Sequence, residues 1–157
     1  MKKYLLLILI SFHVSNRCDA QEITKDQQIS NTLKEFYSSY TKIISKSYFP
    51  FKKEQLVELS LLQKKYCTKK VILEYKQWYE DGHDLFTNDW EVDTKSLNTM
   101  RIIKNLKTQN SYNVSFIVDS NPVSPQKIVK KDIQLQINLI KNGKIYKINS
   151  IIDITKE

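Results

Sequence analysis

Glycine and arginine are both scarce in this sequence. Gly82 and Gly143 are the only glycines among its 157 residues, and Arg101 is the only arginine after residue 20. A nucleotide cradle of the glycine-rich type needs several closely spaced glycines, so that backbone N–H groups can approach the phosphates. Bidentate recognition of phosphate favours arginine. We therefore expect the lysines that give the formal net charge of +8 to lie on solvated faces and not to bind a nucleic acid.

The chain also lacks an apolar run long enough to cross a bilayer as a helix, which takes about 20 residues. The apolar run of residues 5–14 is short and follows two lysines. A polar stretch follows the apolar run and ends in the small residue Ala20, as signal-peptidase cleavage requires. We therefore expect residues 1–20 to be a cleaved signal peptide. The protein would then be exported, to the periplasm or out of the cell, without a membrane span.

Cysteine is limited to Cys18 and Cys67. Cys18 belongs to the predicted signal peptide, so Cys67 is alone in the mature chain and no intramolecular disulfide can form. A lipid anchor on Cys18 is not expected, because Asn16 and Arg17 stand where lipoprotein signals carry small and apolar residues. We expect Cys67 to be a small buried hydrophobe. The core must then be held together by packing alone.

Helical spacing dominates the first half of the mature chain. Apolar and aromatic side chains recur every three or four residues over residues 29–44, behind Thr24 or Asp26 as a cap. This pattern predicts an amphipathic helix of about five turns. A second helix is predicted over residues 53–64. Thr68 is the expected N-cap of a third helix.

From about residue 97 the apolar period changes to two. Alternation over residues 112–118 and over residues 133–139 predicts two strands. The dipeptide Asn142-Gly143 suits a two-residue type I′ turn, so we expect the second strand to form a hairpin with the end of the chain. The pairs that this turn implies are Leu139 with Tyr146, Ile137 with Ile148, Leu135 with Ser150, and Ile133 with Ile152.

The predicted order is three helices, an acidic stretch and then three or four antiparallel strands. Helices segregated from strands indicate the α+β class, with the helices packed on one face of the sheet. No linker, repeat or low-complexity segment divides residues 21–157. We therefore expect this part of the chain to form one domain.

Four stretches, in this order along the chain, carry a resemblance to a known superfamily: EFYSSY, KKYCTKK, HDLFTNDWEVD and NGKIYKINSI. The pattern they form covers most of residues 22–154 and resembles small exported bacterial domains of the nuclear transport factor 2-like superfamily. The resemblance implies a cone-shaped, cystatin-like arrangement of N-terminal helices on a curved sheet. That superfamily includes ketosteroid isomerase-like enzymes, dehydratases, ligand carriers and interacting domains such as some toxin-immunity proteins. The resemblance therefore implies a fold but no single function.

Residues 79–93, YEDGHDLFTNDWEVD, form what we call the acidic segment. It holds six carboxylates and no lysine or arginine, in a chain that is otherwise basic. Gly82 suits a left-handed cap at the end of the third helix, so the segment should run from a helix end into a loop. Its apolar residues are expected to be buried and to hold the loop on the core, while its carboxylates face water. These apolar residues are Leu85, Phe86, Trp90 and Val92.

Part of the acidic segment has the spacing of a calcium loop. Asp89, Glu91 and Asp93 match the first three ligand positions of an EF-hand. That loop also needs glycine at its sixth position and glutamate at its twelfth, where this sequence has Thr94 and Met100. An EF-hand is therefore excluded.

Other metal or catalytic uses of the segment have weaker support. Asp81, Asp84 and Asp89 could form a looser divalent-cation site by oxygen-ligand chemistry. Zinc usually needs several histidine or cysteine ligands, and the mature chain offers only Cys67 and His83. His83 could serve as a general base, but no partner nucleophile is recognisable. We therefore predict no metal, no cofactor and no catalytic residue.

The acidic segment is the candidate binding site of this sequence. A local reversal of charge suits a basic partner, and tyrosine and tryptophan are enriched at protein interfaces. The competing use is internal pairing with Lys69, Lys70 or Lys76. The residues predicted to make contact are Tyr79, Asp81, His83, Asp84, Asp89, Trp90 and Glu91.

The functional prediction follows from export and this one patch. We expect a non-catalytic binding domain of the bacterial cell envelope that acts by protein contact, with toxin neutralisation as one concrete form. The alternative is a small-molecule binder, or an isomerase- or dehydratase-like enzyme, that uses the interior of the cone. The alternative needs an enclosed cavity with an ionisable group inside it.

Overall fold

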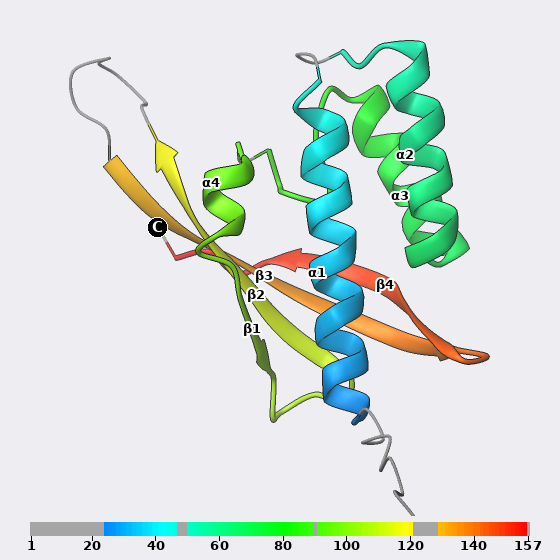
Figure 1. Ribbon diagram of the computed structural model, residues 1–157, viewed down its shortest axis with the longest axis vertical. Coiled ribbons are helices and arrows are strands. Elements are labelled where there is room, and N and C mark those ends of the chain that lie inside the picture. Colours follow the sequence, from blue (N-terminus) through cyan, green and yellow to red (C-terminus); the bar gives the residue numbers. More distant parts are fainter. Residues whose placement is uncertain (1–23, 47–49, 90, 121–128, 157) are drawn as a thin grey trace, which may run out of the picture.

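The computed structural model describes residues 24–46, 50–89, 91–120 and 129–156. The predicted signal peptide and Trp90 lie outside this part. Helices come first along the chain and strands follow (Figure 1), which confirms the predicted α+β class. The elements are α1 Lys25–Ile44, α2 Lys53–Tyr66, α3 Lys69–Glu80, α4 Thr94–Leu97, β1 Arg101–Lys104, β2 Ser111–Ser120, β3 Val129–Asn142 and β4 Ile145–Asp153.

Two of the predicted helix caps are present. The Thr24 hydroxyl accepts the backbone N–H of Gln27, and the Gln27 side chain accepts the N–H of Thr24, which is a capping box at the start of α1. Asp26, the other cap considered for α1, instead accepts the Tyr112 hydroxyl of β2 at 2.6 Å. The Thr68 hydroxyl accepts an N–H from the first turn of α3, as predicted.

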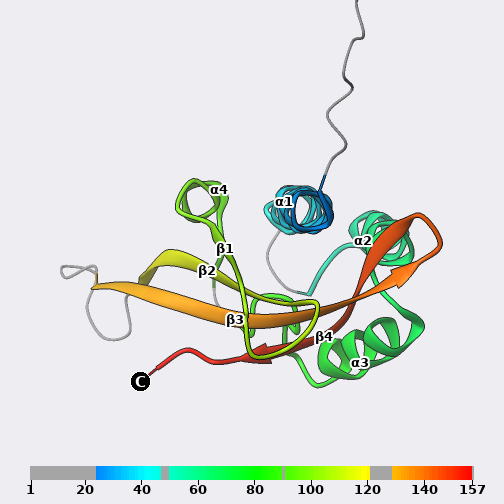
Figure 2. The same ribbon diagram turned by 90° about the horizontal axis from the view of Figure 1, so that it is seen from below.

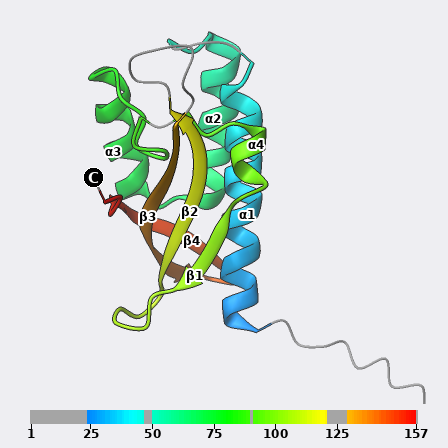
Figure 3. The same cartoon turned by 90° about the vertical axis from the view of Figure 1, so that its left-hand side faces the viewer.

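The strands form an open antiparallel sheet in the order β1-β2-β3-β4. Figures 2 and 3 show that the sheet is curved, with α1 lying across one of its faces and α3 beside β4. The face toward α1 carries the alternating residues of the two longest strands, all buried as predicted: Tyr112, Val114, Phe116 and Val118 of β2, and Ile133, Leu135, Ile137 and Leu139 of β3. No helix in the described part of the chain is long and apolar enough to span a membrane.

The β3–β4 hairpin forms, but its register differs from the predicted one. The two loop residues are Gly143 and Lys144, so Leu139 pairs with Ile148 and not with Tyr146. Gly143 has a φ of 62°, and a positive φ at the first loop position is typical of a type II′ turn. A shift of two residues leaves each side chain on its predicted face. Tyr146 and Ile148 are therefore buried, as expected.

A bulge in β4 changes the rest of the register. Leu139 pairs with Ile148, whereas the preceding residue, Asn138, pairs with Ser150. Asn149 is therefore the extra residue of the bulged strand, opposite no partner in β3. An inserted residue cannot be seen in a strictly alternating pattern of apolar side chains.

The bulge exchanges the faces of the last residues in β4. Ile151 is 8% exposed and faces the core, whereas Ile152, which was predicted to lie there, is 49% exposed. For these reasons the remaining predicted pairs are wrong: Ile137 with Ile148, Leu135 with Ser150, and Ile133 with Ile152.

The junction between α2 and α3 is attached to the sheet. Cys67 forms a single parallel bridge with Ile148 of β4, and the N–H of Thr68 donates to the Ile148 carbonyl at 2.9 Å. The Cys67 side chain is buried, and burial raises the pKa of its thiol to about 12. The thiol is therefore neutral and unreactive near neutral pH. The interpretation of Cys67 as a small buried hydrophobe is confirmed.

Candidate functional site

The acidic segment leaves α3 through a Schellman motif. Gly82 has a φ of 87°, and its N–H donates to the carbonyl of Tyr79 at 3.1 Å. The N–H of His83 donates to the carbonyl of Trp78 at 2.8 Å. Both bonds satisfy carbonyls at the helix end. The predicted left-handed cap at Gly82 is confirmed, and it fixes the direction in which the segment leaves the helix.

Apolar residues attach the segment to the core. Leu85, Phe86 and Val92 are each no more than 3% exposed, as predicted. The ring of Phe86 packs edge-on against the Tyr40 ring of α1, with 5.1 Å between ring centroids, and is stacked with the Tyr75 ring of α3 at 4.9 Å. One aromatic ring of the segment thus joins two helices.

Asp84 does not face water, and the prediction for this carboxylate is wrong. Its Oδ1 accepts the hydroxyl of Tyr40 at 2.7 Å and the N–H of Phe86 at 2.9 Å. Its Oδ2 accepts the hydroxyl of Thr87 at 2.6 Å. Burial raises the pKa of Asp84, and the nearby charge of Asp89 acts in the same direction, although the three hydrogen bonds oppose both. Asp84 is therefore an internal support of the loop.

The tyrosines around Asp84 act as hydrogen-bond donors. Burial raises the pKa of Tyr37 and of Tyr40 well above the ordinary value, and the Asp84 charge raises both further. Each hydroxyl therefore keeps its proton. Tyr40 donates to the Asp84 carboxylate, and Tyr37 donates to the backbone carbonyl of Phe86 at 3.0 Å. Two residues of α1 thus hold adjacent parts of the acidic segment.

The tip of the loop is closed by side-chain hydrogen bonds. Asn88 and Asp89 have φ values of 50° and 62°, a left-handed conformation that asparagine and aspartate adopt more readily than other residues with a side chain. Asp89 Oδ1 accepts the N–H of Asp84 at 2.6 Å, and Asp89 Oδ2 lies 2.7 Å from His83 Nδ1. The Asn88 amide donates to the carboxylate of Asp153 in β4 at 2.7 Å. These bonds hold the left-handed backbone of the tip in place.

An open hollow of about 200 Å³ lies at the tip, which we call the His83 hollow. Its lining residues are Trp78, Asp81, His83, Asn88 and Asp89. Three predicted contact residues therefore come together. Trp78 and Asn88 were missed, because the period of α3 placed Trp78 on its inner side and Asn88 belongs to no pattern. The volume is below the range of about 300–1,000 Å³ that is usual for ligand cavities.

The other predicted contact residues lie apart from this hollow. Tyr79 is half-buried, and its hydroxyl accepts the N–H of Phe51 at 3.1 Å. The carboxylate of Asp84 is directed inward, as described above. Glu91 lines a second hollow, and Trp90 lies outside the described residues.

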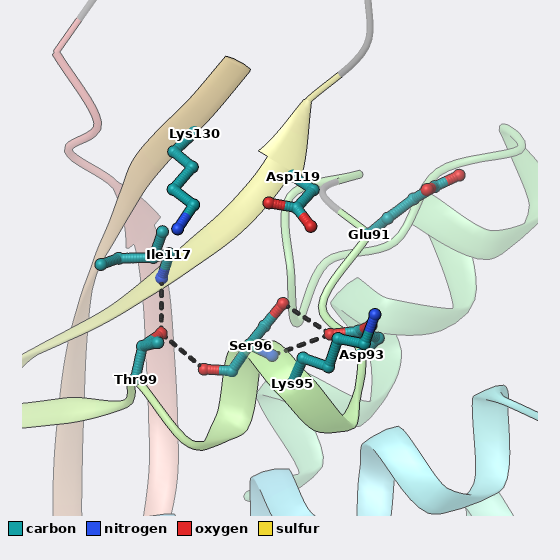
Figure 4. A pocket seen from close by; sticks show the side chains of 8 residues that line it. All are labelled: Glu91, Asp93, Lys95, Ser96, Thr99, Ile117, Asp119 and Lys130. Carbon is teal, nitrogen blue, oxygen red and sulfur yellow. Dashed lines mark hydrogen bonds between the residues drawn. The ribbon is translucent and has the colours of Figure 1, made fainter. Parts of the chain in front are cut away.

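The second hollow, which we call the β2-edge groove, has a volume of about 300 Å³. Figure 4 shows its side chains, which come from the end of the acidic segment, from α4 and the turn after it, and from β2 and β3. The lining residues are Glu91, Asp93, Lys95, Ser96, Thr99, Ile117, Asp119 and Lys130.

The short helix α4, which the sequence did not predict, is started by Asp93. The Asp93 carboxylate accepts the N–H of Ser96 at 2.8 Å and its hydroxyl at 2.9 Å. The hydrogen bond from the Ser96 N–H is the main reason why the pKa of Asp93 is lowered. Asp93, one of the three residues with the spacing of a calcium loop, is therefore the N-cap of α4.

The described residues offer no metal site. No group of three or more histidine, cysteine, aspartate or glutamate side chains among them could hold a metal ion. Both oxygens of Asp84 already accept hydrogen bonds from Tyr40, Phe86 and Thr87. The looser cation site considered for these three aspartates is therefore wrong.

Lysine side chains of the same chain form few ion pairs with the acidic segment. In the described part of the chain the one ion pair between a lysine and the segment joins Lys76 to Glu80 at 3.7 Å, with both side chains mostly exposed. Lys69 and Lys70 form no ion pair with it there. The water-facing carboxylates of Asp81, Asp89 and Glu91 therefore have no internal lysine partner among the described residues.

Comparisons with known proteins show a likeness of fold. No protein-family model matches this chain, and no curated protein matches it. A protein of unknown function from Bacteroides thetaiotaomicron, solved by crystallography, is similar in structure, with a TM-score of 0.63. The similarity covers 80% of this chain and 89% of that chain, at 17% sequence identity. At this identity the likeness extends to the fold alone.

Proposed function

We propose that this chain is an exported binding domain of the bacterial cell envelope, with a nuclear transport factor 2-like cone, that acts by contact with a basic protein. The acidic segment is the contact surface, and neutralisation of a toxin is one form that such contact takes. No catalytic step is assigned to it.

One observation carries the proposal: the segment is held firmly from the inside, while the outer carboxylates of Asp81 and Glu91 form no ion pair among the described residues. Phe86 and Asp84 are fixed by α1 and α3. Asp81 and Glu91 face water, whereas the Asp89 carboxylate is bonded to His83 and to the N–H of Asp84. A surface that is already ordered loses little conformational entropy on binding. Its uniform charge favours encounter with a basic partner.

The fold assignment within this proposal is supported by architecture. α1 lies across a curved antiparallel sheet of four strands (Figure 2), and a β3–β4 hairpin closes the chain. This arrangement agrees with the cone implied by the four sequence stretches. The similar Bacteroides protein adds a shared fold without a known function.

The alternative, a small-molecule binder or an enzyme that uses the cone interior, has less support. The inner face of the sheet is filled by apolar side chains, and Phe116 of β2 packs against Tyr37 of α1 with 5.0 Å between ring centroids. Asp84 has the burial and raised pKa expected of a catalytic carboxylate. Its oxygens are taken up by Tyr40, Thr87 and the Phe86 backbone. Neither hollow described above is lined by Asp84.

The test neutralises the outer carboxylates and leaves Asp84 intact. A variant with Asp81→Asn and Glu91→Gln keeps an oxygen at each position that can still accept hydrogen bonds, and it leaves intact the Asp89 carboxylate that closes the loop. We expect it to have the wild-type urea midpoint but to lose the proteins that the wild-type chain captures from an envelope extract. Those proteins should be basic and should be released by salt, because salt screens exposed charges.

The matched control neutralises two other carboxylates, Glu54→Gln on α2 and Glu74→Gln on α3. Neither side chain forms an ion pair among the described residues. The control variant should capture the same proteins as the wild type. Capture of an unchanged set of proteins by the variant with neutralised outer carboxylates would contradict the proposed function.

A further inference from the structure

β2 continues past the point where β1 stops pairing with it. The last pair toward that end joins Arg101 to Ser115, whereas β2 runs on to Ser120 with β3 as its neighbour. We propose that this free edge of β2, together with the β2-edge groove, binds an extended basic segment of a partner protein as an added strand. The inference rests on the proposed function and specifies how the partner would dock.

The backbone of Asp119 is directed toward this edge. The N–H of Ile117 points away from β3, since it donates to the Thr99 hydroxyl at 2.8 Å. N–H groups of alternate residues in an antiparallel strand point to the same side. The N–H and carbonyl of Asp119 therefore point to the side that β1 has left. Among the described residues this N–H has no hydrogen-bond acceptor.

The space where β1 would continue is the β2-edge groove. Thr99 closes the groove at one end, where its hydroxyl bonds both to Ile117 of β2 and to the carbonyl of Ser96 in α4. Beyond Thr99, Figure 4 shows Asp119, Glu91 and Lys130 arranged around open space. The volume of about 300 Å³ reaches the lower end of the range for ligand sites. The groove can therefore hold a short stretch of extended chain.

The charged side chains of the groove determine which kind of partner segment can bind in it. The groove is lined by three carboxylates (Glu91, Asp93 and Asp119) and two lysines (Lys95 and Lys130). Among the described residues none of these five forms an ion pair. The carboxylates outnumber the lysines in this lining, so the local field favours a cationic ligand. Backbone hydrogen bonds would supply affinity, as in other cases of β-strand addition.

The competing explanation is protection of the edge. Exposed charged side chains on a free strand keep it from pairing with other chains, and Asp119 and Lys130 could serve only that purpose. The two explanations differ in what they predict for a basic extended peptide. A protected edge rejects it, whereas a docking edge pairs with it through the backbone of Asp119.

The experiment titrates the full chain, labelled with ¹⁵N, with a short synthetic peptide of alternating lysine and valine. We expect chemical-shift changes at the amides of Ile117 and Asp119. Asp119→Pro removes the N–H that faces the groove and leaves the bonds to β3, a position where an edge strand tolerates proline. This variant should bind the peptide about tenfold more weakly or worse. Asp119→Asn keeps the N–H and should lose less affinity.

Three further ligands complete the test. A lysine–valine peptide with methylated backbone nitrogens has the same charge but cannot donate, so it should lose affinity even if Asp119→Pro fails to fold. A glutamate–valine peptide should not bind, because its charge matches that of the acidic segment. Free lysine amide should not reproduce the shifts, since it has no strand backbone. Binding of lysine amide at the same amides would overturn strand addition in favour of a small-molecule site.

The inference and the proposed function fail in different ways. If Asp81→Asn with Glu91→Gln weakens peptide binding while Asp119→Pro and backbone methylation do not, the proposed charge contact is supported and strand addition is wrong. If the peptide does not bind at all, the charged side chains only protect the edge and the inference is wrong. Unaltered binding to the variant lacking the outer carboxylates would instead contradict the proposed function.

Discussion

The chain turns through a left-handed glycine at two places, at Gly143 between β3 and β4 and at Gly82 after α3. Both glycines have positive φ, and at neither would a Cβ atom meet another atom within 4 Å. After Gly143 the chain pairs at once with the strand it has left. After Gly82 it makes a loop whose shape depends on side chains, including the two left-handed residues Asn88 and Asp89.

The difference shows that the acidic segment depends on its exact sequence more than the hairpin turn does. The hairpin turn is held by backbone bonds, and the side chains at its tip are exposed. The acidic segment is held by Phe86, by the Asp84 carboxylate and by Asp89. Because Phe86, Asp84 and Asp89 fix this loop, the outward carboxylates of Asp81 and Glu91 are free for another use.

The largest expected effect comes from the ring that holds the segment. Phe86→Ala leaves a cavity between α1 and α3, and we expect the free energy of unfolding to fall by about 3–5 kcal/mol. Urea denaturation followed by circular dichroism measures the loss. The control is Leu106→Ala, a residue 91% exposed, which should change stability by less than about 0.5 kcal/mol. Similar losses for the two variants would show that the segment is not anchored by Phe86.

A smaller effect, with a dependence on pH, is expected at Asp84. Asp84→Asn weakens the bonds to Tyr40 and Thr87 and should cost about 1–3 kcal/mol. The raised pKa of Asp84 means that the folded state holds this proton more tightly than the unfolded state. This contribution is therefore complete below the ordinary aspartate pKa of about 3.9 and is lost as pH rises through the folded pKa.

The stability difference between wild type and Asp84→Asn should accordingly narrow as pH rises from about 4. Urea titrations at several pH values measure it. A difference that widens with pH would mean that the fold favours the charged carboxylate, contrary to burial as the dominant cause.

The smallest effects are expected at the two glycines. Gly82→Ala and Gly143→Ala should each cost about 1–2 kcal/mol, the price of a left-handed conformation for alanine. Steric contact of the new Cβ atom should add no further loss of stability, because no other atom lies within 4 Å of either Cβ position. Gly82→Asn and Gly143→Asn are the matched controls, and they should cost less since asparagine visits this conformation more readily. Equal costs for alanine and asparagine would contradict a conformational origin.

Much of the fold was predictable from the sequence, because it depends on local patterns. Thr24 and Thr68 cap helices by a chemistry that a few residues specify, and alternation predicted the inner faces of β2 and β3. The register of the hairpin was not predictable, since Asn142-Gly143 and Gly143-Lys144 are both plausible loops. The bulge at Asn149 has no local signal in the sequence.

The candidate site was predictable as a segment but not as a geometry. Composition marked residues 79–93, and Leu85, Phe86 and Val92 are buried as expected. The inward direction of Asp84 depends on Tyr40, which is 44 residues away along the chain. The approach of Asp119 and Lys130 to Glu91 depends on tertiary structure in the same way. Long-range contacts of this kind leave no periodic signal.

Amide hydrogen exchange, measured residue by residue with NMR, tests most directly whether the acidic segment is a pre-ordered surface. The amides of Asp84, Phe86 and Asp89 donate to groups within the loop, and we expect them to be protected to a degree close to that of Val114 in β2. Lys144, at the tip of the hairpin, should exchange rapidly and serves as the reference. Exchange of the three loop amides as fast as that of Lys144 would contradict the account.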